Sequence, residues 1–265
     1  MRPQSGIPNG TPLEGSFVPS TAPVVDCFVM VPAITTVDND HDSLHLACMR
    51  FRPSRPGPEA QLVQQFFSES RLRAFPDCRI TAFKEPKLEG AYPDIVLVVW
   101  RPSVTRTWRP ERKNINASDL RLLQHLVACG DQPDADLVRL FGIGYKSRVE
   151  RLKVADLILR TGKSWRAKPL SSIFAAVAIV AIEAKISNWG TALQQAFLNT
   201  WFASNSYVLV PGSKVGDKLA AAASAKGVGI LSTDACLSFK RSRMLPRSYA
   251  SWQLNEWAWR ASLAA

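Results

Sequence analysis

The feature that most constrains this fold is an apolar segment, residues 174–186, whose only charged side chains are Glu183 and Lys185. The alternating segment is predicted to form a core strand, and side chains two residues apart on a strand share a face. Glu183 and Lys185 are therefore expected on one face. An ion pair at an exposed strand edge is the simpler interpretation. Charges are costly to bury unless they are paired or bind a metal, so we favour a functional site.

Composition limits the architecture and the kind of partner. The 265 residues are 46% hydrophobic, which is enough for one sizeable core or two smaller ones, and two folded units are expected. The chain has 33 Lys and Arg against 22 Asp and Glu, a net charge of +11. This surplus favours a polyanionic partner, nucleic acid ahead of a membrane surface. The five cysteines are far apart and indicate neither a disulfide framework nor a zinc knuckle.

The N-terminal segment argues against export. Residues 1–23 are rich in Pro, Gly, Ser and Thr and lack the apolar run of a signal peptide, so we expect a disordered leader. The only long apolar run, residues 173–182, is half the roughly 20 residues that a membrane-spanning helix needs. We therefore expect a soluble, cytoplasmic protein without a membrane partner.

Predicted helices and strands alternate on both sides of a helical region. The first part contains a helix at 58–67 and strands at 79–83 and 94–100, with further candidate strands at 26–32 and 44–51. The last part contains strands at 174–186, 206–211 and 227–231, with helices at 189–203 and 217–226. This alternation predicts an α/β fold. The tail, residues 249–265, carries three tryptophans and is expected to dock as an amphipathic segment.

The middle region has a different pattern. Ser118 is the expected N-cap of a first helix that stops at Gly130, and a second helix spans residues 134–141. A third runs from Tyr145 to about Leu157 and is followed by a hairpin with a turn at 161–164. The order is helix, helix, glycine turn, helix and hairpin.

A Glu-x-Lys tripeptide alone is a weak signal, because it occurs at residues 85–87, 111–113 and 183–185. Only the third ends an apolar strand. Asp94 stands directly beside another apolar strand, 94–100. Two acids and a lysine brought together on neighbouring strands would form a hard oxygen site suited to Mg²⁺.

With these residues the chain resembles the PD-(D/E)xK nuclease superfamily. The match consists of Glu59, Pro93-Asp94, Glu183-Ala184-Lys185 and Gln195, with Asn199 where an aromatic residue is often found. The resemblance implies a restriction-endonuclease-like mixed sheet flanked by helices. It also implies that Asp94 and Glu183 bind Mg²⁺ or Mn²⁺ and that Lys185 orients or activates the attacking water. Glu59 and Gln195 are then further catalytic residues. Glu59 could equally be a helix first-turn acid, and Glu85 is a competing acid.

The spacing departs from the usual layout of that superfamily. Asp94 and Glu183 lie 89 residues apart, far more than a hairpin needs. An insertion at a surface turn explains the gap if its own ends lie close together. We therefore predict a discontinuous nuclease-like domain, residues 24–100 and 171–248, interrupted by residues 115–168. The inserted segment resembles a winged helix-turn-helix.

Basic residues concentrate at the end of this insertion. Residues 142–168 contain eight basic and two acidic side chains, a surplus typical of a DNA contact surface. A solvated face on a packing domain is the simpler alternative. The resemblance implies that the third helix enters the major groove while the hairpin reaches phosphates or the minor groove. The predicted DNA-binding residues are Tyr145, Lys146, Ser147, Arg148, Arg151, Lys153, Arg160, Lys163 and Arg166.

The leading hypothesis is a metal-dependent nuclease that hydrolyses a DNA backbone and needs no small-molecule cofactor. The alternative is a DNA-binding transcriptional regulator whose nuclease-like core is inactive and serves dimerisation or sensing. A scaffold that binds protein through the winged helix is a third class. The sequence also leaves room for a homodimer.

Overall fold

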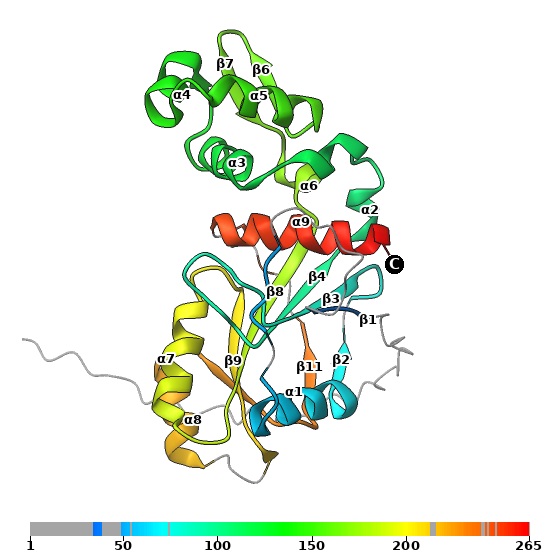
Figure 1. Cartoon of the computed structure of the whole chain (residues 1–265), viewed down its shortest axis with the longest axis vertical. Helices are drawn as coiled ribbons and strands as arrows, with labels where there is room; N and C mark the ends of the chain where they lie inside the picture. The colour runs from blue at the N-terminus through cyan, green and yellow to red at the C-terminus, as the bar shows by residue number, and fades with distance from the viewer. Residues whose placement is uncertain are drawn as a thin grey trace, which may run out of the picture.

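The computed structural model describes residues 34–38, 49–53, 55–73, 75–212, 216–239, 242, 244–246 and 248–264. Its centre is a six-stranded mixed sheet in the order β1-β3-β4-β8-β9-β10 (Figure 1). The strands are β1 (Ile34–Val37), β3 (Arg79–Lys84), β4 (Ile95–Trp100), β8 (Ala176–Ala184), β9 (Asn205–Leu209) and β10 (Gly229–Leu231). The α/β class is confirmed.

Pairing within the sheet is mixed. Strands β3, β4 and β8 are antiparallel neighbours, while β8, β9 and β10 run parallel and β1 runs parallel to β3. Every residue of β4 and β8 is buried, because layers cover both faces of the sheet centre. A strand buried on both faces is apolar throughout, which is why Glu183 stands out in β8.

One face of the sheet is covered by α1 (Pro58–Glu69). Leu62 and Phe66 of this helix share a core with alternate residues of β8, among them Val180 and Ile182. A short parallel ladder of β2 (Arg71–Arg73) and β11 (Cys236–Ser238) joins the same layer through Leu72.

The opposite face is covered by α7 (Trp189–Asn199) and α9 (Tyr249–Ala264), with α8 (Asp217–Ala225) beside α7. The α7 helix packs on Val208 of β9, and Val208 is the register partner of Glu183. Register partners share a face, so Glu183 lies on the α7 side of the sheet.

A helical module, residues 101–175, connects β4 to β8. It contains α2 (Pro102–Thr105), the 3₁₀ helix η1 (Pro110–Asn114), α3 (Ala117–Cys129), β5 (Gln132–Pro133), α4 (Asp134–Phe141), α5 (Tyr145–Val154), β6 (Ile158–Thr161), β7 (Ser164–Ala167) and α6 (Leu170–Ile173). Its three strands form an antiparallel sheet in the order β5-β7-β6. The two ends of the module meet, because the Arg101 amide donates to the Ala175 carbonyl at 3.0 Å.

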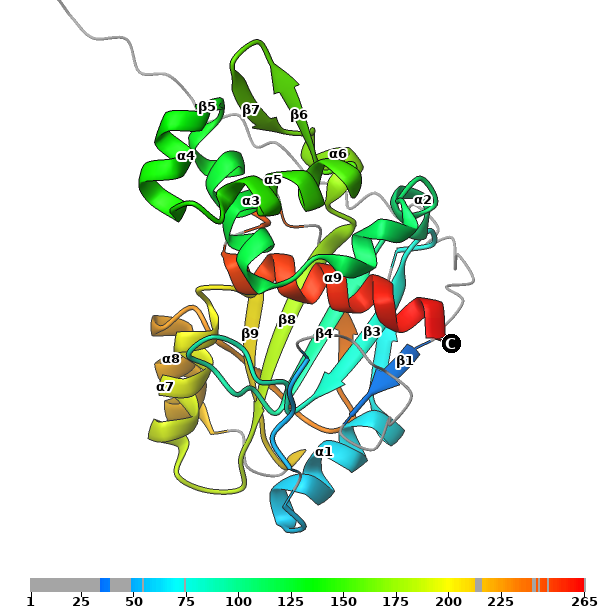
Figure 2. The same cartoon turned by 45° about the horizontal axis from the view of Figure 1, so that its top comes forward.

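The C-terminal helix α9 lies between the helical module and the sheet (Figure 2). Residues 250–261 are all buried, and Trp252 and Trp257 belong to a core that includes side chains of both α3 and β4. The expected amphipathic segment is therefore a helix covered on all sides. One hydrophobic core extends from the module through α9 to the sheet.

Several elements were not predicted from the sequence. These are β1, β2, β11, the two-residue β5 and the short helices α2, η1 and α6. The candidate strand 26–32 and the expected leader lie outside the described residues, as does 44–51 except at its last three positions, where Phe51 bridges to Pro86. None of the described helices has the length and apolar character needed to cross a bilayer.

Candidate functional site

Strand pairing places three carboxylates side by side at one end of the sheet. Lys84 pairs with Ile95, and Ile95 pairs with Ile182. One residue further along this register, Glu85, Asp94 and Glu183 form a row across β3, β4 and β8, which we call the carboxylate row. The Glu85 amide donates to the Asp94 carbonyl at 2.8 Å, and the Ala184 amide donates to Asp94 Oδ2 at 2.8 Å.

The backbone at Glu85 is unusual. Glu85 has φ of 50°, a left-handed conformation that is uncommon for a residue other than glycine. Its contacts with Asp94 and Arg52 hold this conformation at the end of β3. Such local strain is concentrated at functional sites, so it adds to the case for this end of the sheet.

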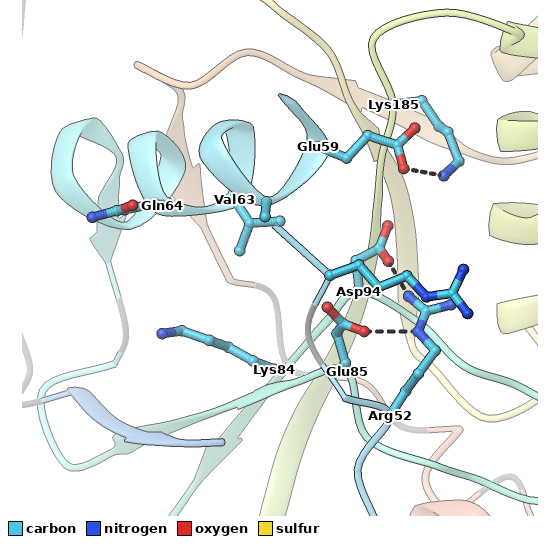
Figure 3. Close-up of a pocket in the computed structure, with 10 residues that line it drawn as sticks. Arg52, Glu59, Val63, Gln64, Lys84, Glu85, Asp94 and Lys185 are labelled. Atoms are coloured by element: carbon cyan, nitrogen blue, oxygen red, sulfur yellow. Dashed lines mark hydrogen bonds and ion pairs between the residues drawn. The ribbon is translucent and has the colours of Figure 1, made fainter. Parts of the chain in front are cut away.

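Arg52 bridges two members of the carboxylate row. Its Nε donates to Glu85 Oε2 at 2.7 Å, and one terminal nitrogen donates to Asp94 Oδ1 at 2.9 Å (Figure 3). The sequence carried no signal for this contact, because Arg52 belongs to a proline-rich stretch with no motif of its own.

Glu183 is buried, with 3% of its surface exposed. Burial, reinforced by the negative charge of Asp94, raises the pKa of Glu183 to about 8. A hydrogen bond from Asn199 Nδ2 to Glu183 Oε1 at 2.6 Å and the positive charges of Lys185 and Arg52 oppose this rise. Glu183 is thus an acid whose ionised form needs a further positive charge.

The pKa of Asp94 is also raised, mainly by burial and with a smaller contribution from Glu85. The Ala184 amide, Lys185 and Arg52 lower it. Two neighbouring acids with raised pKa values indicate that the nearby positive charges do not fully balance the negative charge of this site.

Lys185 follows the last residue of β8, and its Nζ lies 2.8 Å from Glu59 Oε2 on α1 (Figure 3). Glu183 instead contacts Asn199 on α7, which covers the opposite face of the sheet. The two side chains therefore contact different layers, although alternation predicts a shared face. The reason is that β8 ends at Ala184. Lys185 therefore lies just beyond the end of the strand, where its long side chain can reach α1.

A cavity of about 690 Å³ opens beside the carboxylate row. Glu59, Glu85, Asp94 and Lys185 line it, and Arg52, Arg55 and Lys84 add positive charge. Glu183 is not among its lining residues. The cavity therefore offers a mixed set of carboxylates and cations to a ligand.

Gln195 is not brought to the carboxylate row. It is exposed on α7, whereas Asn199, one turn later, faces inward and contacts Glu183. The spacing of four residues between Gln195 and Asn199 could be read from the sequence. Which of the two side chains reaches Glu183 depends on how α7 packs on the sheet.

The donor set suits a hard cation in its chemistry. Mg²⁺ commonly takes only one or two protein carboxylates, and Asp94 and Glu183 are adjacent carboxylates with raised pKa values that a cation would relieve. Among the described residues, no three His, Cys, Asp or Glu side chains are grouped closely enough to hold a metal ion. Any cation would therefore rely on this pair with water and substrate.

The nine predicted DNA-binding residues divide into two groups, those held by contacts within the module and those at its surface. Tyr145 is buried, and Arg151 is held by two hydrogen bonds to Asp119 of α3, at 2.9 and 2.8 Å. Further contacts within the module join Lys153 to Glu150, Arg160 to Asp134 and Trp165, and Arg166 to Asp131.

Lys146, Ser147, Arg148 and Lys163 remain turned to the surface. Lys146, Ser147 and Lys163 are exposed, and Arg148 is half-buried over the ring of Phe141. Within the part of the chain that the structure describes, neither Lys146 nor Lys163 has an acidic partner.

The helical module and the carboxylate row lie at opposite ends of the sheet. The module joins at Arg101 and Ala175, whereas Asp94 and Glu183 are at the other ends of β4 and β8. Figure 1 shows the module beyond one end of these strands. A nine-residue strand spans about 30 Å, which sets the scale of this separation.

No family model matches this chain, and comparison with curated proteins and with solved structures also finds no match.

Proposed function

We propose that this protein is a metal-dependent nuclease whose reaction centre lies where β4 begins and β8 ends. The observation that carries the proposal is the register that sets Asp94 opposite Glu183, with Lys185 next along the chain. Both acids have raised pKa values because their charges are buried together. Clusters of titratable groups with perturbed pKa values beside a cavity are typical of catalytic sites.

In this proposal Asp94 and Glu183 hold one Mg²⁺ or Mn²⁺ ion. A bound ion of this kind lowers the pKa of water and stabilises negative charge on a phosphate. Lys185, which lines the cavity, orients the attacking water, and Glu59 holds the Lys185 ammonium group at 2.8 Å. Asn199 keeps the Glu183 carboxylate in position. Gln195 has no assigned task.

The proposed fold is the restriction-endonuclease-like one. Its support is the order of α1, the antiparallel strands β3, β4 and β8, then α7 and the parallel strand β9. We propose further that the helical module is an inserted winged helix-turn-helix, with α5 as the recognition helix and β6-β7 as the wing. Its support is the order of three helices, α3, α4 and α5, followed by the β6-β7 hairpin, with the short β5 between α3 and α4 adding a third strand to the hairpin.

DNA is the proposed substrate. The surplus of positive charge lies on α5 and the wing. These elements are further from the carboxylate row than the length of β8, about 30 Å, which is roughly one turn of B-DNA. Cutting is therefore expected about one helical turn or more from the module's footprint. A homodimer would place two such sites on one duplex.

A second function is favoured by one observation. Glu183 is closed off by burial and does not line the cavity, and Arg52 already compensates Asp94 and Glu85. A buried acid that does not reach the cavity suits a DNA-binding regulator that senses or dimerises without cutting.

The deciding experiment incubates the protein with linear, supercoiled, branched and single-stranded DNA in Mg²⁺ or Mn²⁺. Asp94→Asn and Lys185→Ala are run in parallel, and Gln195→Ala serves as a matched control outside the site. Cutting that needs metal, disappears in the first two variants and persists in the control is expected. Tight DNA binding without cutting on any substrate would instead support the regulator.

A further inference from the structure

We infer that Arg52 is an internal cation of the carboxylate row that competes with a divalent metal ion for Asp94 and is released toward the substrate. This inference rests on the proposed function, because it assigns a regulatory group to the same site. Arg52 lies in the proline-rich stretch before α1, outside the Pro93-Asp94 and Glu183-Ala184-Lys185 motifs.

The contact geometry of Arg52 supports this role. The guanidinium group uses two different nitrogens to reach two carboxylates on neighbouring strands, Glu85 at 2.7 Å and Asp94 at 2.9 Å. A planar fork of donors matches carboxylate oxygens well, so this single cation pairs with two members of the row and offsets part of their negative charge. Asp94 cannot give the same oxygen fully to a metal ion while Arg52 holds it.

The backbone of Arg52 is fixed beside the row. The Arg52 amide donates to the Glu85 carbonyl at 2.9 Å, and the Lys87 amide donates to the Arg50 carbonyl at 2.7 Å. Phe51 pairs with Pro86 between these two bonds. The guanidinium group is therefore held near the carboxylates at high effective concentration, even when its own contacts open.

The Arg52 side chain can leave without unfolding the site. It is 45% exposed and lines the cavity together with Arg55, Lys84 and Lys185. A phosphodiester in this cavity would offer Arg52 an anion in exchange for Asp94, since guanidinium groups bind phosphate and carboxylate with the same fork. The Asp94 carboxylate is then open to a metal ion.

The test measures binding of Mn²⁺ alone to the full chain by calorimetry. Arg52→Gln is expected to bind Mn²⁺ roughly tenfold more tightly than the wild type, within the range usual for coupled sites. Arg52→Lys should fall between them, because it keeps the charge without the fork. Arg55→Gln removes an equal charge from the same cavity without breaking an ion pair of the described residues, and should leave the affinity unchanged.

A second readout separates competition from simple removal of charge. At saturating Mn²⁺, Arg52→Gln is expected to cut DNA more slowly despite its tighter metal binding, because glutamine cannot pair with the phosphate as the guanidinium group does. Circular dichroism and thermal unfolding check that each variant is folded. If Arg52→Gln does not fold, Arg52→Lys is compared with the wild type instead.

Each result decides between the two proposals. Equal Mn²⁺ affinity in the wild type and Arg52→Gln, with a wild type that cuts DNA, overturns the role of Arg52 alone. Weaker binding in Arg52→Gln also overturns it, since Arg52 would then hold the carboxylates in place for the ion. Absence of Mn²⁺ binding in every variant overturns the metal-dependent function and this inference together.

Discussion

At the scale of single residues, Glu183 is an acid in an apolar strand with one neutral donor, Asn199, on its carboxylate. Burial makes the ionised form costly, and the neighbouring Asp94 adds to the cost. The same features that make this carboxylate a candidate ligand for a cation therefore make it a source of instability when no cation is bound.

The stability of the metal-free protein should therefore depend on pH through Glu183. Glu183 binds its proton up to about pH 8 in the folded chain but only to about pH 4.5 when unfolded. Between these values the folded state holds a proton that the unfolded state has released. The free energy of unfolding should fall as pH rises through this window, by at most about 1.4 kcal/mol per pH unit.

Glu183→Gln tests this prediction, because glutamine keeps an oxygen for Asn199 and carries no charge. The variant should be more stable than the wild type above pH 8, similar near pH 5, and inactive with metal. Glu59→Gln, a change of the same kind on a half-exposed acid of the cavity, is the control. Urea titrations across pH measure both, and parallel pH profiles for the wild type and Glu183→Gln would contradict the assignment.

At the scale of secondary-structure elements, α9 is joined to both ends of the helical module by buried polar groups. Glu256 accepts from Arg112 of η1 at 2.6 and 2.9 Å, and the Arg112 guanidinium stacks on Trp108. Asn255 accepts from the amides of Ala175 and Ala176, at the start of β8. These contacts explain why a helix rich in tryptophan also contains charged residues.

Breaking the buried pair of Arg112 and Glu256 should be costly. Both side chains are almost fully buried, so Glu256→Gln leaves a guanidinium charge without its counter-ion and should lower the free energy of unfolding by about 3–5 kcal/mol. The double variant Arg112→Met with Glu256→Leu should be destabilised by less than the sum of the two single changes. Guanidinium chloride titrations measure this, and simple additivity would show that the pair contributes no coupling.

At the scale of the whole molecule, the basic module and the carboxylate row are separated by the length of the sheet, with α9 between the module and the sheet face (Figure 2). The module is therefore packed into the core and is not an appendage. If the module is the DNA-binding part, its exposed cations rather than its paired ones should set the salt dependence.

Lys146 and Lys163 test whether the exposed cations of the module set the salt dependence of DNA binding. Removing one lysine–phosphate interaction should reduce the log–log slope of DNA affinity against salt by roughly 0.9, so the double alanine variant should flatten the slope clearly. Arg166→Ala should have a smaller effect, because Arg166 is paired with Asp131. Fluorescence anisotropy between low and moderate salt provides the slopes, and an unchanged slope in the lysine variant would place the DNA-binding surface elsewhere.

Much of the element pattern could be predicted from the sequence by itself. Apolar periodicity and turn residues located α1, β3, β4, α3, α4, α5, the hairpin and the alternating elements after it, because these signals are local. Caps were less certain: Asn116, not Ser118, caps α3. The Glu183-Ala184-Lys185 tripeptide was visible because a charge in a buried strand is rare.

Only the tertiary structure decided which of these residues meet. Residues distant in sequence, such as Asp94 and Glu183, become neighbours through the β4–β8 register, and Arg52 and Asn199 reach them through a bridge and a helix face. The burial of α9 on all sides likewise depends on two layers that enclose it. Local patterns follow from nearest neighbours along the chain, whereas register, burial and charge compensation depend on partners that the chain brings together only on folding.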